Sequence, residues 1–487
     1  MKITSLARFL PLLLLGSFLP TTTPAMTVNL NIPYNTVTSG PRSDFPVIFY
    51  APEQPNFLFD SGDHIDIWMQ STNRALKISW GLCRNMVDTP FITGTVLPAM
   101  DESFKISIPT DKLLPAFYNL RVHVELTATK SMDVTSAFGW KATEIPFVNV
   151  VPDDFKAYWQ AQKAKVDATP LDLKCTFVKK MTNDEINDYN VHHAALPESY
   201  DPEGEKYKEI EIYAVNWASA NGPGQRTYGW YAKPVGDGPF PALLVLPGAG
   251  NVSRPYPVEH ARHGFASLDV NVHNSPADLP WPQYASPHYS DPFTTPDAYW
   301  GHQVYLNAMG AVDAILQLPG VDKDKLAVMG GSQGGRATVV VAAMDSRVKA
   351  AIPAIAHFDN IPYLLWTQRL NAAHDAGFRP FTDKDVVHDD AMRVQSHYDV
   401  ANFAPWIKGA VLMNAGLIDG ASYPMGTFQV FHNLTQAKSK KILPMPNIAH
   451  DWSPFFDRYA WRWLDEQLGV PVSPTPPQST IDLNPKP

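Results

Sequence analysis

Three side chains whose combined chemistry is acyl transfer follow one another along the chain. Ser332 lies at the centre of the glycine-rich pentapeptide Gly330–Gly334, and Asp419 and His450 follow it in that order. A serine hydroxyl becomes a nucleophile when a neighbouring base takes its proton, and a carboxylate holds that base in one tautomer. The residue types and their order predict a catalytic triad of Ser332, Asp419 and His450.

Each of the three also has a structural explanation. A G-x-S-x-G pentapeptide occurs by chance in chains of this length, where it forms a plain glycine-rich turn. Asp419 stands beside Gly420 and is also typical of a turn, whereas His450 could be an ordinary loop histidine. Asp451 is a second candidate for the acid, although a residue does not easily fold back onto the imidazole of its neighbour.

The surrounding elements must bring these side chains to one place. Short apolar runs, typical of buried strands, precede the three residues at 326–329, 410–414 and 441–445. A helix-compatible run, 336–343, follows the serine, and a G-x-S-x-G turn between a strand and a helix is how an α/β-hydrolase exposes its nucleophile. Since the carboxyl ends of parallel strands meet at one edge of a sheet, we expect the three side chains to converge there.

The tetrahedral intermediate of acyl transfer carries an oxyanion, which needs backbone N–H donors. One expected donor is Gln333, the residue after the nucleophile, at the start of a helix whose dipole favours negative charge. The second is Ala249, in the loop Pro247–Gly250 that follows the expected strand 242–246. A plain glycine-rich turn explains this loop almost as well.

Residues 151–470 read as alternating strands and helices. Further strands are expected at 207–218, 227–233, 242–246, 266–272 and 350–355. Apolar residues at helical spacing predict a helix over 304–315, and an earlier helix runs from about 155 to 166 with Asp153 as its N-cap. Short buried strands that alternate with helices predict a mostly parallel sheet covered by helices on both faces, as in the α/β-hydrolase fold. The proline-rich segment 271–297 leaves the carboxyl end of a strand, so we expect it to wall the active site.

Residues 27–150 read instead as strands in which apolar and polar residues alternate. The clearest alternations are 65–70 and 120–127, and further strands are expected at 75–83, 104–109 and 144–150. This pattern predicts a small antiparallel, immunoglobulin-like β-sandwich. Its Trp68, Trp80 and Trp140 are candidates for glycan binding, although burial in the core is the more common fate of tryptophan.

The two ends and the composition predict where the protein works. Residues 1–25 carry basic residues, an apolar run and then small residues, which is typical of a secretory signal peptide. We therefore expect a secreted or periplasmic protein with no membrane contact after cleavage of the signal, and a loose proline-rich tail at 471–487.

The net charge of −9 comes without a basic block, so nucleic acid is not an expected partner. Cys83 and Cys175 leave open whether a disulfide forms, and no histidine has a metal-binding spacing, so we expect neither a metal nor another cofactor.

With these motifs, the chain resembles the acetyl xylan esterase and cephalosporin C deacetylase family of α/β-hydrolases. Residues 330–335 match the family's Gly-Gly-Ser-Gln-Gly-Gly elbow, 416–419 its acid loop and 450–451 its histidine–carboxylate pair. Residues 152–159 and 170–172 match its amino-terminal helix and arm. The resemblance covers about residues 150–470. It implies an esterase that removes acetyl groups from xylose-based oligosaccharides or similar small esters through an acyl-enzyme on Ser332, with acetyl preferred over butyryl.

Three departures leave the substrate range and the assembly open. The family usually has Arg-Gly-Gln where this chain has Val-His-Asn-Ser at 272–275, and many relatives have a tyrosine where Ala249 stands. The family's Cys-Pro-Pro after the acid is replaced by Ala-Ser-Tyr-Pro at 421–424. Relatives often form hexameric rings, but the additional amino-terminal domain leaves open whether this chain forms a homo-oligomer.

Two other functions compete with the esterase. A peptidase similar to prolyl oligopeptidases would also have a β-domain before an α/β-hydrolase, but about 120 residues are too few for a propeller of at least four ~40-residue blades. A catalytically inert glycan-binding protein would not require all three of Ser332, Asp419 and His450. A comparison of acetyl esters with prolyl amides, and labelling of Ser332 by a fluorophosphonate, would separate the three functions.

Overall fold

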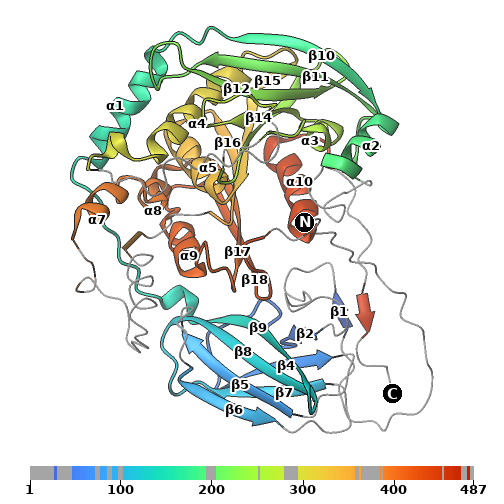
Figure 1. The fold of residues 1–487 in the computed structure, drawn as a ribbon, viewed down its shortest axis with the longest axis vertical. Helices are drawn as coiled ribbons and strands as arrows, with labels where there is room; N and C mark the ends of the chain where they lie inside the picture. The colour runs from blue at the N-terminus through green and yellow to red at the C-terminus, as the bar shows by residue number, and fades with distance from the viewer. Residues whose placement is uncertain are drawn as a thin grey trace.

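The chain folds into an all-β part and a larger α/β part, which lie at opposite ends of the view in Figure 1. The computed structural model describes residues 27–29, 47–71, 77–84, 90–96, 103–193, 204–250, 253–278, 294–356, 361–362, 384, 386, 388–451, 454–472 and 480–482. The signal peptide predicted at 1–25 lies outside the described residues.

A nine-stranded sheet forms the centre of the α/β part. In spatial order its strands are β10 (Lys174–Thr182), β11 (Glu209–Ala218), β12 (Arg226–Pro234), β14 (Ala266–Asn271), β13 (Phe240–Leu246), β15 (Val321–Gly331), β16 (Val348–Ala354), β17 (Ala410–Gly416) and β18 (Ser439–Met445). The six strands from β14 to β18 pair in parallel, whereas β10, β11 and β12 add an antiparallel edge. The predicted mostly parallel sheet is therefore confirmed.

Helices cover both faces of this sheet because its parallel strands are apolar on both sides. The helices are α1 (Phe155–Ala168), α2 (Asn183–His193), α3 (Val258–Arg262), α4 (Gly301–Ile315), α5 (Gln333–Met344), α7 (Asp390–Gln395), α8 (Val400–Phe403), α9 (Pro424–Asn433) and α10 (Pro454–Leu468). β13 turns Leu244 toward the cluster that contains α1, α4 and α5, and the preceding Leu243 toward the cluster that contains α10. The α/β-hydrolase fold that the sequence predicts is the fold that is found.

The start of α1 differs in detail from its prediction. Asp154, and not Asp153, is the N-cap residue, and its side chain makes no capping hydrogen bond. Its carboxylate lies instead 2.9 Å from Nε2 of His397, which follows α7. The cap is therefore replaced by a tertiary contact to a residue far along the chain.

The all-β part is a sandwich of two sheets. One contains β2 (Val47–Tyr50), β4 (His64–Ser71) and β7 (Ser103–Pro109), and the other contains β3 (Leu58–Phe59), β9 (Lys130–Trp140), β8 (Ala116–Thr127), β5 (Lys77–Arg84) and β6 (Ile92–Val96). Alternate residues such as Ile65, Ile67 and Leu120 point into one shared core. All strand pairs are antiparallel except β3 with β9. This agrees with the predicted N-terminal sandwich.

The strand predicted at 144–150 is wrong. A short 3-10 helix ends at Glu144, and the following residues pair with no strand among those described. Pro146 has no N–H to give to a ladder. The carbonyls of Val148 and Val150 accept hydrogen bonds from Gln429 and Asn402, at 3.2 and 2.8 Å. The segment is thus a connection fastened to the α/β part by side chains.

The tail is not loose throughout its length. β19 (Thr480–Asp482) pairs antiparallel with β1 (Thr27–Asn29) in a separate two-stranded sheet. This stretch, Thr-Ile-Asp, lacks the prolines of its surroundings and therefore keeps the N–H groups that a ladder needs.

The structure answers the question that the sequence left open about the two cysteines. Cys83 is buried and Cys175 exposed, and both are free thiols, so the disulfide left open by the sequence is not formed.

The three candidate tryptophans of the sandwich differ in their surroundings. Trp140 is buried in the sandwich core, and Trp80 packs against this core. Trp68 stacks on Tyr50 with ring centroids 6.2 Å apart. Glycan binding by these tryptophans stays a prediction.

The sandwich and the α/β part share one hydrophobic cluster. Leu417 and Ile418, which directly precede Asp419, belong to the cluster that fills the sandwich, as does Phe428 of α9. The rings of Phe117 and Phe428 lie 4.7 Å apart. The domain boundary expected after residue 150 stays a prediction, since the core runs across it.

We expect Phe428→Ala to lower the free energy of unfolding by about 3–5 kcal/mol, the usual loss when a buried phenylalanine is truncated. Urea titration would measure this loss. Phe177→Ala is the matched control, because Phe177 is 55% exposed. Equal losses in the two variants would mean that the aromatic contact does not join the two parts.

Candidate active site

Ser332 lies in a sharp turn between β15 and α5. Its backbone is held at φ +57° and ψ −116°, a conformation that is costly for a residue with a β-carbon. The flanking glycines make the turn sterically feasible. A Cβ at Gly330 would lie 2.5 Å from the carbonyl oxygen of Leu246, and one at Gly334 would overlap the same oxygen. The strained turn therefore presents the serine hydroxyl at the carboxyl edge of the sheet.

The structure brings Ser332, Asp419 and His450 together. Nε2 of His450 lies 2.9 Å from Oγ of Ser332, and Nδ1 lies 2.8 Å from Oδ2 of Asp419. With the Nδ1–H donated to the carboxylate, Nε2 is left to accept the hydroxyl proton. The three residues follow β15, β17 and β18, so parallel strands of one sheet deliver them to the same edge. Their catalytic roles are part of the proposed function.

The carboxylate of Asp419 is fully buried and accepts three hydrogen bonds. Besides the imidazole, the backbone N–H groups of Ala421 and Ser422 donate to its Oδ1, each at 2.8 Å. The Ser422 hydroxyl in turn donates to the carbonyl of Ile355 at 2.9 Å. The stretch that departs from the family pattern therefore orients the acid. The structure places Asp419, rather than Asp451, against the ring of His450.

The side chain of Gln333 connects the nucleophile turn to the loop that precedes α3. Gln333 is 1% exposed, and its Nε2 donates to the carbonyl of Gly248 at 3.2 Å and to Nε2 of His273 at 3.3 Å. His273 accepts through an unprotonated nitrogen, so its own proton lies on Nδ1. Ala249, next to Gly248, is exposed. The oxyanion-hole roles of the Gln333 and Ala249 N–H groups stay predictions, but their two segments lie against each other.

A buried asparagine fixes the backbone on either side of His273. Asn307 of α4 donates from Nδ2 to the carbonyl of Val272 at 2.8 Å and to Oδ1 of Asn274 at 2.7 Å. Its Oδ1 accepts from Ser219 and Thr227, at 2.6 and 2.9 Å. All polar atoms of this amide are therefore engaged, which holds the 272–274 segment in one position.

Sequence reasoning missed the side-chain roles of Gln333, His273 and Asn307. His273 stands where the family usually has Arg-Gly-Gln, and that departure was the available signal. Asn307 lies within a periodic apolar helix and gives no signal of its own.

We expect Gln333→Ala to lower kcat by about tenfold to a hundredfold with little change in KM, because a loop misplaced by about 1 Å weakens transition-state contacts more than substrate binding. Steady-state hydrolysis of p-nitrophenyl acetate would measure both constants. Gln395→Ala on α7 is the control and should leave both unchanged. If kcat is unaltered in the Gln333 variant, the hydrogen bonds of the Gln333 side chain do not contribute to catalysis.

The ends of the segment predicted to wall the site are anchored. Its start is held by Asn307, and near its end the hydroxyls of Tyr398 and Tyr158 donate to Pro296 and Asp297, at 2.6 and 2.7 Å. Residues 279–293, the middle of this wall, lie outside the described residues. The wall therefore stays a prediction.

No three His, Cys, Asp or Glu side chains gather as metal ligands in the described part of the chain. Within the same ranges, no helix combines the length and the apolar character that a membrane crossing requires.

The model of the acetyl xylan esterase family (AXE1) matches residues 185–467. The chain belongs to this family. It is similar to acetyl esterase Axe7A of Xylanibacter ruminicola, with 24% identity over 436 residues, which cover 83% of this chain and 89% of that protein. The acetyl xylan esterase family assignment confirms the resemblance in the sequence, and it makes the chain an esterase rather than a peptidase or an inert binding protein.

One solved structure supports the fold. Acetyl xylan esterase 1 from Thermoanaerobacterium sp. superposes with a TM-score of 0.51 at 21% identity, and the match covers 67% of this chain and 98% of that chain. The acetyl xylan esterase from Paenibacillus sp. R4 gives a TM-score of 0.49 at 24% identity, with 66% and 97% covered.

Proposed function

We propose that this esterase removes acetyl groups from hydroxyls of xylan-type oligosaccharides, or of similar small esters, through an acyl-enzyme on Ser332. The observation that carries the proposal is the continuous hydrogen-bonded chain from Ser332 through His450 to Asp419. The relatives are named acetyl esterases and acetyl xylan esterases, which supports the acetyl group and the carbohydrate. The pattern of residues 1–25 supports a secreted or periplasmic location, where such polymers are found.

Acylation begins when His450 takes the hydroxyl proton of Ser332 and Oγ attacks the acetyl carbonyl carbon. The buried Asp419 stabilises the imidazolium that forms, because its carboxylate lies 2.8 Å from Nδ1. The carbonyl oxygen becomes an oxyanion, and we assign its binding to the backbone N–H groups of Gln333 and Ala249. When the intermediate collapses, His450 gives its proton to the departing sugar oxygen.

Deacylation repeats these steps with water. His450 takes a proton from a water molecule, whose oxygen attacks the acetyl-Ser332 carbonyl, and the proton then returns to Oγ as acetate leaves. The imidazole ring is suited to this exchange because its side chain is 32% exposed and thus open to solvent.

We expect acetyl esters to be hydrolysed at least about tenfold faster than butyryl esters, since each additional methylene that a small pocket must accommodate changes the barrier by about 1–3 kcal/mol. Measuring kcat/KM on p-nitrophenyl acetate and butyrate would check this. Acetate release from acetylated xylo-oligosaccharides would test the carbohydrate. Equal or faster butyrate hydrolysis would overturn the acetyl preference, and turnover of the nitrophenyl ester without acetate release from the oligosaccharides would overturn the substrate class.

A further inference from the structure

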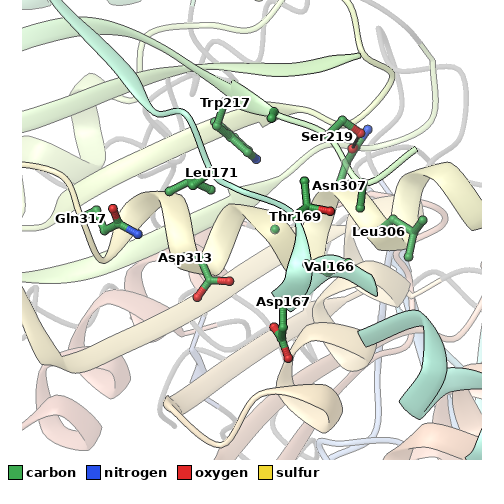
Figure 2. A pocket seen from close by; sticks show the side chains of 13 residues that line it. Val166, Asp167, Thr169, Leu171, Trp217, Ser219, Leu306, Asn307, Asp313 and Gln317 are labelled. Atoms are coloured by element: carbon green, nitrogen blue, oxygen red, sulfur yellow. Dashed lines mark hydrogen bonds between the residues drawn. The ribbon is translucent and has the colours of Figure 1, made fainter. Parts of the chain in front are cut away.

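A cavity lies away from the triad, between the end of α1, the end of β11 and one side of α4 (Figure 2). Its volume of about 350 Å³ falls within the usual range of small-molecule sites, roughly 300–1,000 Å³. Ser332, Asp419 and His450 do not line it. Its lining includes polar and apolar groups, among them Asp167, Thr169, Leu171, Trp217, Asp313 and Gln317.

One wall offers a hydrogen-bond donor without an acceptor. Trp217 is only 1% exposed, and in the described part of the molecule its Nε1–H donates to no acceptor. In Figure 2 the indole extends from the end of β11 toward α4. The N–H faces Gly310, where an added Cβ would lie 3.5 Å from Nε1. The indole N–H can therefore donate to an acceptor atom that enters this cavity.

Two aspartates of the lining offer acceptors. Asp313 accepts from Arg347 through Oδ1 at 2.7 Å, and Asp167 is paired with Lys163 through Oδ1. Among the described contacts, neither Oδ2 accepts a hydrogen bond. These oxygens can therefore accept from a ligand. Because Arg347 also pairs with Asp345, the lining keeps a negative charge.

This combination selects the chemistry of the ligand. The lining holds a donor and carboxylate acceptors, and no lysine or arginine lines the cavity, so an anion such as phosphate or acetate would meet the carboxylates without a cation beside it. A neutral ring with several hydroxyls can accept from the indole and donate to the carboxylates. Its C–H face can rest on Leu171, and the Thr169 and Gln317 side chains add further hydrogen-bonding groups.

We propose that this cavity is an accessory sugar-binding site, separate from the catalytic serine. The class of ligand follows from the lining, and the choice of a xylose unit rests on the proposed function. An accessory site of this kind retains an oligosaccharide on the enzyme between deacetylation events. It would act on the apparent affinity for oligosaccharides, and not on the chemistry at Ser332.

The test measures binding of xylobiose, which carries no ester, to the full chain by isothermal titration calorimetry. Gly310→Ala places a methyl group over the indole N–H at ordinary contact distances, 3.5 Å from Nε1 and 3.8 Å from Cγ1 of Val166. Alanine also favours the helix by about 1 kcal/mol over glycine, so this variant should fold. Gln303→Ala, on α4 outside the cavity, is the matched control.

We expect xylobiose to bind the unaltered protein and the control variant with the same affinity. Gly310→Ala should bind it at least about tenfold more weakly, which corresponds to the 1.4 kcal/mol of one lost hydrogen bond. Trp217→Phe, which keeps an aromatic ring but removes the donor, should give the same loss once its melting temperature shows that it is folded. Absence of xylobiose binding, equal binding by Gly310→Ala, or binding of inorganic phosphate in its place would overturn the proposal. If xylobiose binds and Gly310→Ala weakens it while acetylated xylo-oligosaccharides release no acetate, the accessory site stands and the proposed function fails.

Discussion

Ser332→Ala is expected to lower kcat for p-nitrophenyl acetate by about 10⁶-fold, the scale of loss for a triad nucleophile in other serine hydrolases. The reason is chemical: without Oγ, no acyl-enzyme forms, and His450 has no hydroxyl from which to take a proton. The remaining rate comes from the oxyanion donors and from substrate binding alone. Stopped assays at high enzyme concentration would quantify it.

Two controls separate the loss of the nucleophile from the loss of the fold. Ser61→Ala removes an exposed sandwich serine and should keep full activity. A fluorophosphonate should label the unaltered protein and Ser61→Ala, but not Ser332→Ala. Activity in Ser332→Ala close to that of the unaltered protein would refute the acyl-enzyme.

Asp419→Asn is expected to lower kcat by about 10⁴-fold while the protein stays folded. The N–H groups of Ala421 and Ser422 require an acceptor at Oδ1, so the amide oxygen of asparagine would take that place. Its NH2 group would then face Nδ1 of His450 and force the ring proton onto Nε2. In that tautomer the imidazole cannot accept the proton of Ser332.

Asp451→Asn is the matched control, because it makes the same chemical change beside the same histidine. We expect its kcat to stay within about twofold of the unaltered protein, because Asp419, and not Asp451, lies against the ring of His450. Steady-state kinetics of both variants would decide between the two carboxylates. A large loss in Asp451→Asn with a small one in Asp419→Asn would reverse the assignment of the acid.

The sequence predicted that Ser332, Asp419 and His450 would lie close together, because topology does most of the positioning. Each comes directly after an apolar run, and parallel strands deliver the residues at their carboxyl ends to one edge of the sheet. Long-range hydrogen bonds made by side chains were harder to foresee. The bond from Gln333 to Gly248 requires the close approach of two loops. The amide of Asn307 is engaged by residues from three separate segments. No local pattern encodes such contacts.

The fold was predictable where local pattern and burial agree, as in β13 and β17. It was not predictable where a distant side chain replaces a local interaction. The Asp154 carboxylate meets His397 instead of capping α1, and the segment 144–150 gives its carbonyls to Asn402 and Gln429 instead of to a strand. In both places the partner lies more than 200 residues away in the sequence.

The shared cluster of Leu417, Ile418 and Phe428 has a consequence for any shortened form of this enzyme. Deleting the sandwich would turn the support of the acid loop into an exposed apolar patch, which favours aggregation. A viable short form would need polar residues on this surface and new contacts that hold the loop of Asp419 in place. Loss of the sandwich from the gene would therefore require compensating substitutions, which makes this amino-terminal addition difficult to lose in evolution.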